Sequence, residues 1–139
     1  MKLQVQILNV FVKDLKSRCF NRPNIYLINL KPKKTMAKKS NQDPSGTSFF
    51  NDTIQASVTD LRKMFGEPDD DNNRGDDKVN YEWICETSAG EVFTVYDWKH
   101  YRSLGDNEIV SWHIGGPNSM VTDQAVNEIA SLFDEIDAN

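Results

Sequence analysis

The sequence contains few side chains that can do acid–base or nucleophilic chemistry, namely two histidines, two cysteines and several aspartates. Asp97, His100 and His113 are the candidates for a small-ligand or catalytic site, because a carboxylate beside an imidazole can move a proton. A structural hydrogen bond between Asp97 and one histidine explains the same residues. Cys85 alternates with Trp83 in an apolar pattern, which is typical of a buried, inert thiol. These spacings predict neither a metal ion nor a cofactor.

Aromatic side chains form a stronger pattern than reactive ones. Phe93 and Tyr96 are three residues apart on one predicted strand, so their side chains point to opposite faces. Both faces of the sheet therefore carry aromatic rings. One face must pack beneath helices, and the other can expose rings to a partner. Aromatic residues dominate the energetics of protein interfaces, so the densest group supplies the candidate partner-binding residues. These are Phe93, Tyr96, Trp98, Tyr101 and Trp112.

Two polar segments have features of ligand-binding loops, but neither has the full set of residues that such a loop requires. Residues 67–78 are strongly acidic, yet no register of this segment gives the spacing of a calcium-binding EF-hand loop. Gly115 and Gly116 precede a predicted helix, where backbone amides can bind an anion. Because no Lys or Arg accompanies this glycine pair, we interpret it as a simple strand-to-helix turn.

The elements that must position these residues follow from hydrophobic periodicity. A capping box at Ser57 predicts a short helix over residues 58–65, and Gly66 ends it. A longer amphipathic helix is expected over residues 122–136. Between the helices, three segments have the alternation of half-buried strands. These segments are residues 79–86, 91–98 and 108–114.

The order of these elements predicts the fold class. Consecutive strands with short connections favour an antiparallel meander. A sheet of this kind buries one face beneath helices. We therefore expect an α+β domain with two layers, in which a three- to four-stranded antiparallel meander carries a short N-terminal and a longer C-terminal helix on one face.

Charge divides the chain into two parts. The whole chain has a net charge of −5, but residues 1–35 contain eight basic residues and one acidic residue, a net charge of +7. Residues 36–139 contain eight basic and twenty acidic residues, a net charge of −12. Residues 36–49 lack apolar periodicity and are rich in Lys, Ser, Gly and Pro, which predicts a linker. We expect a basic extension at 1–35, a flexible linker at 36–49 and an acidic α+β domain at 50–139.

The basic extension has several interpretations. Polar residues interrupt its apolar stretch and no cleavage motif follows, so a signal peptide is not expected. Its alternating pattern also differs from the amphipathic helix of a transit peptide. Met36 begins an ordinary N-terminal sequence, so residues 1–35 are interpreted as upstream translated sequence or the product of an alternative start. A basic arm that contacts the acidic domain or nucleic acid is the other open interpretation.

Four short motifs carry a resemblance to known proteins. The motifs are FGEP at 65–68, YEW at 81–83, FTVYDWK at 93–99 and WHIGG at 112–116. Together they resemble small proteins of tailed bacteriophages and other large DNA viruses, over about residues 50–135. No activity accompanies that group, so the resemblance implies a viral accessory protein in the host cytoplasm and supplies no site residues.

These observations predict a non-enzymatic module that binds a host or viral protein. One alternative is a nucleic-acid mimic, in which the acids of 67–77 and 123–137 stand in for phosphates and block a basic host protein. Another is a small-ligand binder or enzyme that uses Asp97, His100 and His113. The negative charge of the domain disfavours nucleic-acid binding. The sequence also lacks an apolar run of the roughly 18 residues that a membrane-spanning helix needs.

Overall fold

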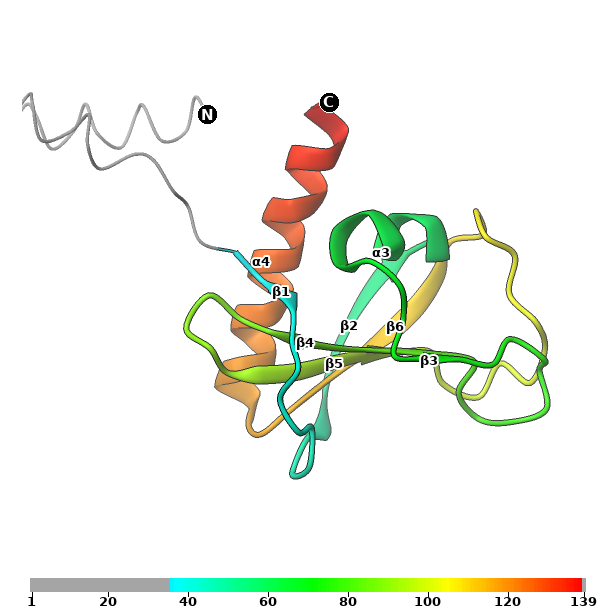
Figure 1. Ribbon diagram of the computed structural model, residues 1–139, viewed down its shortest axis with the longest axis horizontal. Coiled ribbons are helices and arrows are strands. Elements are labelled where there is room, and N and C mark those ends of the chain that lie inside the picture. The colour runs from blue at the N-terminus through cyan, green and yellow to red at the C-terminus, as the bar shows by residue number, and fades with distance from the viewer. Residues whose placement is uncertain (1–35, 139) are drawn as a thin grey trace, which may run out of the picture. The chain divides into compact units, whose positions relative to one another are not determined.

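The structure of the protein is a computed structural model, which describes residues 36–138 (Figure 1). The predicted basic extension lies outside the described residues. The described part contains six β-strands and two α-helices. In chain order these are β1 (Lys38–Lys39), β2 (Ser48–Ala56), α3 (Val58–Phe65), β3 (Asp70–Asp71), β4 (Tyr81–Glu86), β5 (Val92–Tyr96), β6 (Val110–Gly116) and α4 (Ser119–Ala138).

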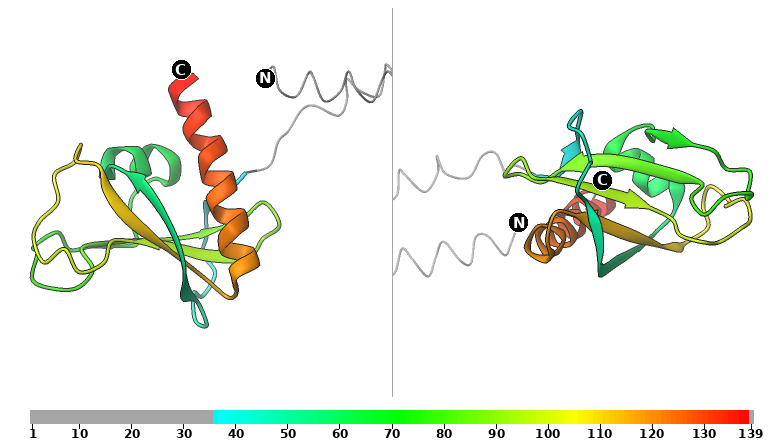
Figure 2. Two further views of the ribbon diagram at one scale, coloured as in Figure 1. Left: turned by 180° about the vertical axis from the view of Figure 1, so that it is seen from behind. Right: turned by 90° about the horizontal axis from the view of Figure 1, so that it is seen from below.

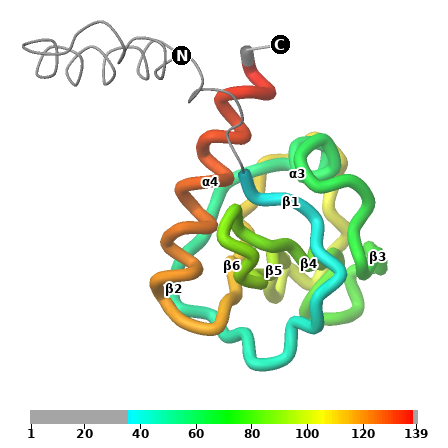
Figure 3. Tube along the Cα trace, turned by 60° about the vertical axis from the view of Figure 1, so that its left-hand side comes forward, coloured from blue at the N-terminus to red at the C-terminus, as the bar shows by residue number. Residues whose placement is uncertain are grey.

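All six strands form one antiparallel sheet with the order β1–β4–β5–β6–β2, and β3 pairs with β4 beside β1 (Figure 3). Strands β4, β5 and β6 form the predicted meander, in which Trp83 lies opposite Val95 and Val95 opposite Ile114. The α+β class is therefore confirmed. The prediction of three or four strands was too low, because β1, β2 and β3 join the sheet without a clear apolar alternation.

The segment that was expected to be a flexible linker contributes to the sheet. The compact unit begins at Met36, and residues 36–49 contain β1 and the first residues of β2. Ala37 is buried, and the backbone N–H of Ser40 donates to the carbonyl oxygen of Ile84 at 3.0 Å. Backbone pairing at a sheet edge requires no apolar pattern, so composition alone suggested a linker here.

Both helices begin at local capping signals. In α3 the hydroxyl of Ser57 accepts from the Asp60 N–H, and the Asp60 carboxylate accepts from the Ser57 N–H, both at 3.0 Å. Gly66 ends this helix with φ at 78°, which a glycine adopts without strain. Helix α4 begins earlier than predicted, because the Asn118 side chain accepts from the Val121 N–H at 3.0 Å.

Helices α3 and α4 cover the same face of the sheet, as the sequence predicted (Figures 1 and 2). The core lies between the two layers, and its largest side chains are Trp83, Trp112 and Phe93, which are completely buried. Both buried indoles donate to backbone carbonyl oxygens, Trp83 to Gly66 at 2.8 Å and Trp112 to Ala56 at 2.9 Å. Neither helix in residues 36–138 is long and apolar enough to span a bilayer.

Candidate functional site

The face of the sheet opposite the helices carries a row of side chains that the core does not use. Side chains alternate between the faces of a strand, so the neighbours of the buried core residues point away from the helices. One such row crosses four strands through directly opposed residues. It runs from Glu82 on β4 through Tyr96 on β5 and His113 on β6 to Thr53 on β2.

Four rings gather along this row, and we call them the open-face cluster: Phe49, Tyr96, Trp98 and His113. The Phe49 ring stacks on His113 with centroids 3.8 Å apart and planes 10° apart. Tyr96 meets His113 edge to face at 5.4 Å and Trp98 at 6.0 Å. Phe49 is 38% exposed and Trp98 39% exposed. The cluster is therefore ordered by ring contacts but accessible from solvent.

Phe49 reaches the cluster through an irregularity in β2. Phe49 lies opposite Gly115 and Thr53 opposite His113, so β2 has two more residues than β6 between these pairs. Asn51 lies within the irregularity and has φ at 73°, a left-handed conformation that asparagine tolerates better than most residues. The extra residues bend the strand. This bend brings the Phe49 ring over His113, although the sequence placed Phe49 in the linker.

A shallow hollow of about 280 Å³ opens beside the cluster. Tyr96 and Trp98 form its aromatic walls and Glu82 its acidic wall, and Gly115 lies at its base. A Cβ atom on Gly115 would lie 2.7 Å from the Thr94 hydroxyl oxygen and 3.4 Å from the Tyr96 ring. Glycine at this position therefore avoids a clash with the Thr94 side chain on the neighbouring strand.

Within the described residues, Glu82 in the acidic wall forms no ion pair. Burial raises the pKa of Glu82, and the neighbouring carboxylates of Asp70 and Asp69 raise this pKa further. Within residues 36–138, the ion pairs of the basic side chains all involve other acids. The sequence analysis did not single out Glu82, although its position next to Trp83 on an alternating strand was a signal that could have placed it on this face.

The charges around the rings differ from one side of the cluster to the other. The ammonium groups of Lys78 and Lys99 lie 5.9 and 5.6 Å from the centroid of the Trp98 ring. Burial raises the pKa of Tyr96, and so does the Glu82 carboxylate. Burial, with a smaller contribution from His100, lowers the pKa of His113, so the stacked imidazole is neutral at pH 7. The cluster thus consists of uncharged rings with the Glu82 carboxylate and the ammonium groups of Lys78 and Lys99 near them.

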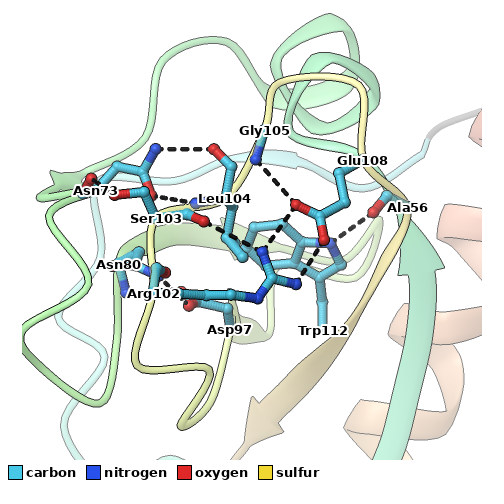
Figure 4. Close-up of polar contacts among 10 residues, drawn as sticks. All are labelled: Ala56, Asn73, Asn80, Asp97, Arg102, Ser103, Leu104, Gly105, Glu108 and Trp112. Atoms are coloured by element: carbon cyan, nitrogen blue, oxygen red, sulfur yellow. Dashed lines mark hydrogen bonds and ion pairs between the residues drawn. The ribbon is translucent and has the colours of Figure 1, made fainter.

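Asp97 does not face the open-face cluster. Its buried carboxylate accepts hydrogen bonds from the backbone N–H groups of Asn80 at 2.8 Å and Tyr81 at 2.9 Å, and from the Asn80 side chain at 3.0 Å. Figure 4 shows that Asn80 also donates to the carbonyl oxygen of Arg102, which ties two loops together. The hydrogen bonds of Asp97 therefore support a structural role, and none of them involves His113.

The five predicted partner-binding residues separate into three groups. Phe93 and Trp112 are completely buried in the core, so neither can contact a partner in the folded chain. Tyr96 and Trp98 belong to the open-face cluster. Tyr101 is 54% exposed but makes none of the ring contacts of the cluster. Parity along the strand predicted two aromatic faces, and the helices determine which face is covered.

The remaining candidates for chemistry do not assemble in the described part of the chain. Cys85 is buried as expected, and burial raises the pKa of its thiol well above the ordinary value. No group of three or more His, Cys, Asp or Glu residues within 36–138 is placed to hold a metal ion. In the acidic segment 67–78, Asp70 and Asp71 form β3 and pair with β4.

Comparison with known proteins does not assign a family. No protein-family model, curated protein or solved structure matches this chain. The resemblance to viral proteins therefore stays a prediction from four short motifs. The function must be inferred from the geometry of the open face.

Proposed function

We propose that this chain is a non-enzymatic protein-binding module that contacts its partner through the open-face cluster. The observation that carries this proposal is the exposure of Trp98 and Phe49 on the helix-free face, where ring contacts hold both side chains in place. Rigid, partly exposed aromatic side chains are the usual anchors of protein interfaces, because they bury a large area with little loss of side-chain entropy.

The shape and charges of the face support a protein partner over a small molecule. The hollow holds about 280 Å³, at the lower limit of the roughly 300–1,000 Å³ typical of small-molecule pockets, and it is too shallow to enclose a ligand as such pockets do. The carboxylate of Asp97 is held by Asn80 and Tyr81, which leaves His113 without the acid that the enzymatic alternative requires. The four sequence motifs extend the proposal to a viral-type accessory protein that acts on a host or viral protein in the host cytoplasm.

The experiment that tests this function compares two aromatic substitutions on the surface. The full chain is immobilised, proteins bound from a host lysate are quantified by mass spectrometry, and each specific partner is then purified for affinity measurement. We expect Trp98→Ala to weaken partner binding at least tenfold, as the loss of an interface anchor does. Tyr101→Ala is the matched control, because it removes an exposed ring outside the cluster and should change the affinity less than twofold.

Two results would contradict the proposal. Equal loss of binding in both variants would show that aromatic surface in general, and not the open-face cluster, holds the partner. Binding that survives Trp98→Ala but disappears at high salt would instead favour the nucleic-acid mimic, whose contacts with a basic partner are electrostatic.

A further inference from the structure

We propose that the hollow of the open face binds the cationic end of a lysine or arginine side chain presented by the protein partner. This inference rests on the proposed function and specifies what the partner offers to the site. The hollow combines the Tyr96 and Trp98 rings with the Glu82 carboxylate, all from β4, β5 and the residues just after β5. Because Glu82 and Tyr96 are opposed across two strands, the acid and a ring lie side by side.

The chemistry of these walls favours a cation. An ammonium or guanidinium group is attracted to the face of a Trp or Tyr ring, and this attraction is strongest where water is excluded. A carboxylate next to the rings adds a charge-assisted hydrogen bond, which is shorter and stronger than a neutral one. The hollow therefore presents both kinds of contact to one side chain, and its open mouth admits the end of a side chain from another protein.

The negative charge of this part of the chain also favours a cationic ligand. Residues 36–139 contain twenty acidic residues and eight basic residues. Glu82 is partly buried beside Asp69 and Asp70, and within residues 36–138 it is absent from the ion pairs. A partly buried carboxylate without a counter-ion lowers stability, and a cation from a partner would remove that cost.

The chain already places cations on one of these rings. The ammonium groups of Lys78 and Lys99 lie within 6 Å of the centroid of Trp98, the distance range of a cation–π contact. Neither ammonium forms an ion pair with Glu82. The Trp98 ring is thus within reach of cations in this setting, and we expect an incoming cation to compete with these two lysines.

The test follows the indole N–H signals of the full chain by nuclear magnetic resonance during titration with capped amino acids. Trp98 reports on the hollow, whereas Trp83 and Trp112 donate to backbone oxygens in the core and serve as internal controls. The probes are Nα-acetyl-arginine amide and Nα-acetyl-lysine amide. Their neutral counterparts are Nα-acetyl-citrulline amide, which nearly keeps the shape of the arginine side chain, and Nα,Nε-diacetyl-lysine amide, in which an acetyl group removes the lysine charge.

The expected result is a saturable shift of the Trp98 signal with a charged probe and unchanged signals for both core indoles. The neutral counterpart should bind at least tenfold more weakly. Glu82→Gln should weaken binding of the charged probe at least tenfold, while the signals of Trp83 and Trp112 confirm that the variant is folded. Replacement of Lys78 and Lys99 by glutamine should strengthen binding severalfold, because it removes the competing cations.

Three results would overturn the inference. These are equal binding of the charged and neutral probes, unchanged binding in Glu82→Gln, and weaker binding after both lysines are replaced. The last result would indicate that Lys78 and Lys99 help to form the hollow and do not compete with the cationic probe for it. Each can occur while Trp98→Ala still abolishes partner capture, so failure of this inference is distinguishable from failure of the proposed function.

Discussion

The two faces of the sheet are both rich in aromatic residues, yet they differ in what the rings do. On the covered face, Trp83 and Trp112 are 0% exposed and satisfy their indole N–H groups with backbone oxygens. On the open face, Trp98 is 39% exposed and is held by Tyr96 and His113. The same residue type therefore stabilises the fold on one face and remains available for contact on the other.

This difference shows that aromatic density does not identify a binding site without knowledge of the layers. The rings of Phe93 and Tyr96 are three residues apart on β5 and lie on opposite faces. The covered ring lies beneath the helices and the open ring lies in the hollow. A contact surface needs rings that are fixed in the free protein yet accessible, and the open-face cluster meets both conditions through stacking between its own members.

The largest effect is expected when the two faces are compared by matched tryptophan substitutions. Trp112→Ala should lower the free energy of unfolding by about 3–5 kcal/mol, because it leaves a large cavity and removes the hydrogen bond to Ala56. Trp98→Ala should lower it by less than about 1 kcal/mol. Denaturant unfolding followed by circular dichroism measures both values, and similar losses in the two variants would contradict the assignment of the faces.

A second comparison concerns Asp97 and its neighbour Trp98, which are adjacent in sequence but differ in burial. Asp97→Ala should lower the free energy of unfolding by about 3 kcal/mol, because buried N–H groups of Asn80 and Tyr81 lose their acceptor. Asp106→Ala removes an exposed carboxylate and serves as the control, with an expected change below about 0.5 kcal/mol. An unchanged stability in Asp97→Ala would reopen the catalytic interpretation of this carboxylate.

The smallest effect concerns the acid on the open face. Glu82→Gln should raise the free energy of unfolding at pH 7 by about 0.5 kcal/mol, a small gain because solvent screens a partly exposed carboxylate. The pKa of Glu82 is higher in the folded chain than the ordinary 4.5, so the ionised form disfavours folding at neutral pH.

The cost of the ionised Glu82 carboxylate to the folding free energy is fully present at pH values above the pKa of Glu82 in the folded chain. It fades as the pH falls toward 4.5 and Glu82 becomes protonated in both states. The stability difference between Glu82→Gln and the natural chain should therefore shrink over that interval, which unfolding curves at several pH values can follow. Glu108→Gln is an informative contrast, because its partners Arg102 and Gly105 lower the pKa of Glu108 to about 2. A Glu82→Gln variant that is less stable at pH 7 would contradict the expected cost of the ionised Glu82 carboxylate in the folded chain.

The parts of the fold that depend on local signals were predicted well from sequence. The capping box at Ser57 and the glycine at Gly66 set the bounds of α3, because both act through backbone groups a few residues away. Alternation and short connections also predicted the β4–β5–β6 meander. In contrast, β1, β2 and β3 were missed, because their pairing depends on exposed edges supplied by distant strands and leaves no strong periodicity.

The candidate site was predicted only in part, because two of its residues join it through pairing between distant strands. Tyr96 and Trp98 stood out by composition, but Glu82 and Phe49 did not. Glu82 joins the site because β4 and β5 pair in a register that sets it beside Tyr96. Phe49 joins it because the irregular β2 bends over His113.

The sequence by itself determined which residues alternate, where α3 begins and ends, and that rings occupy both faces of the central strands. These properties are local, since they follow from backbone geometry over a few residues. Only the tertiary structure decided which face the helices cover, which tryptophan stays exposed and which acid lies beside it. Those outcomes depend on strand register and layer packing between residues far apart in the chain, and no short sequence pattern encodes them.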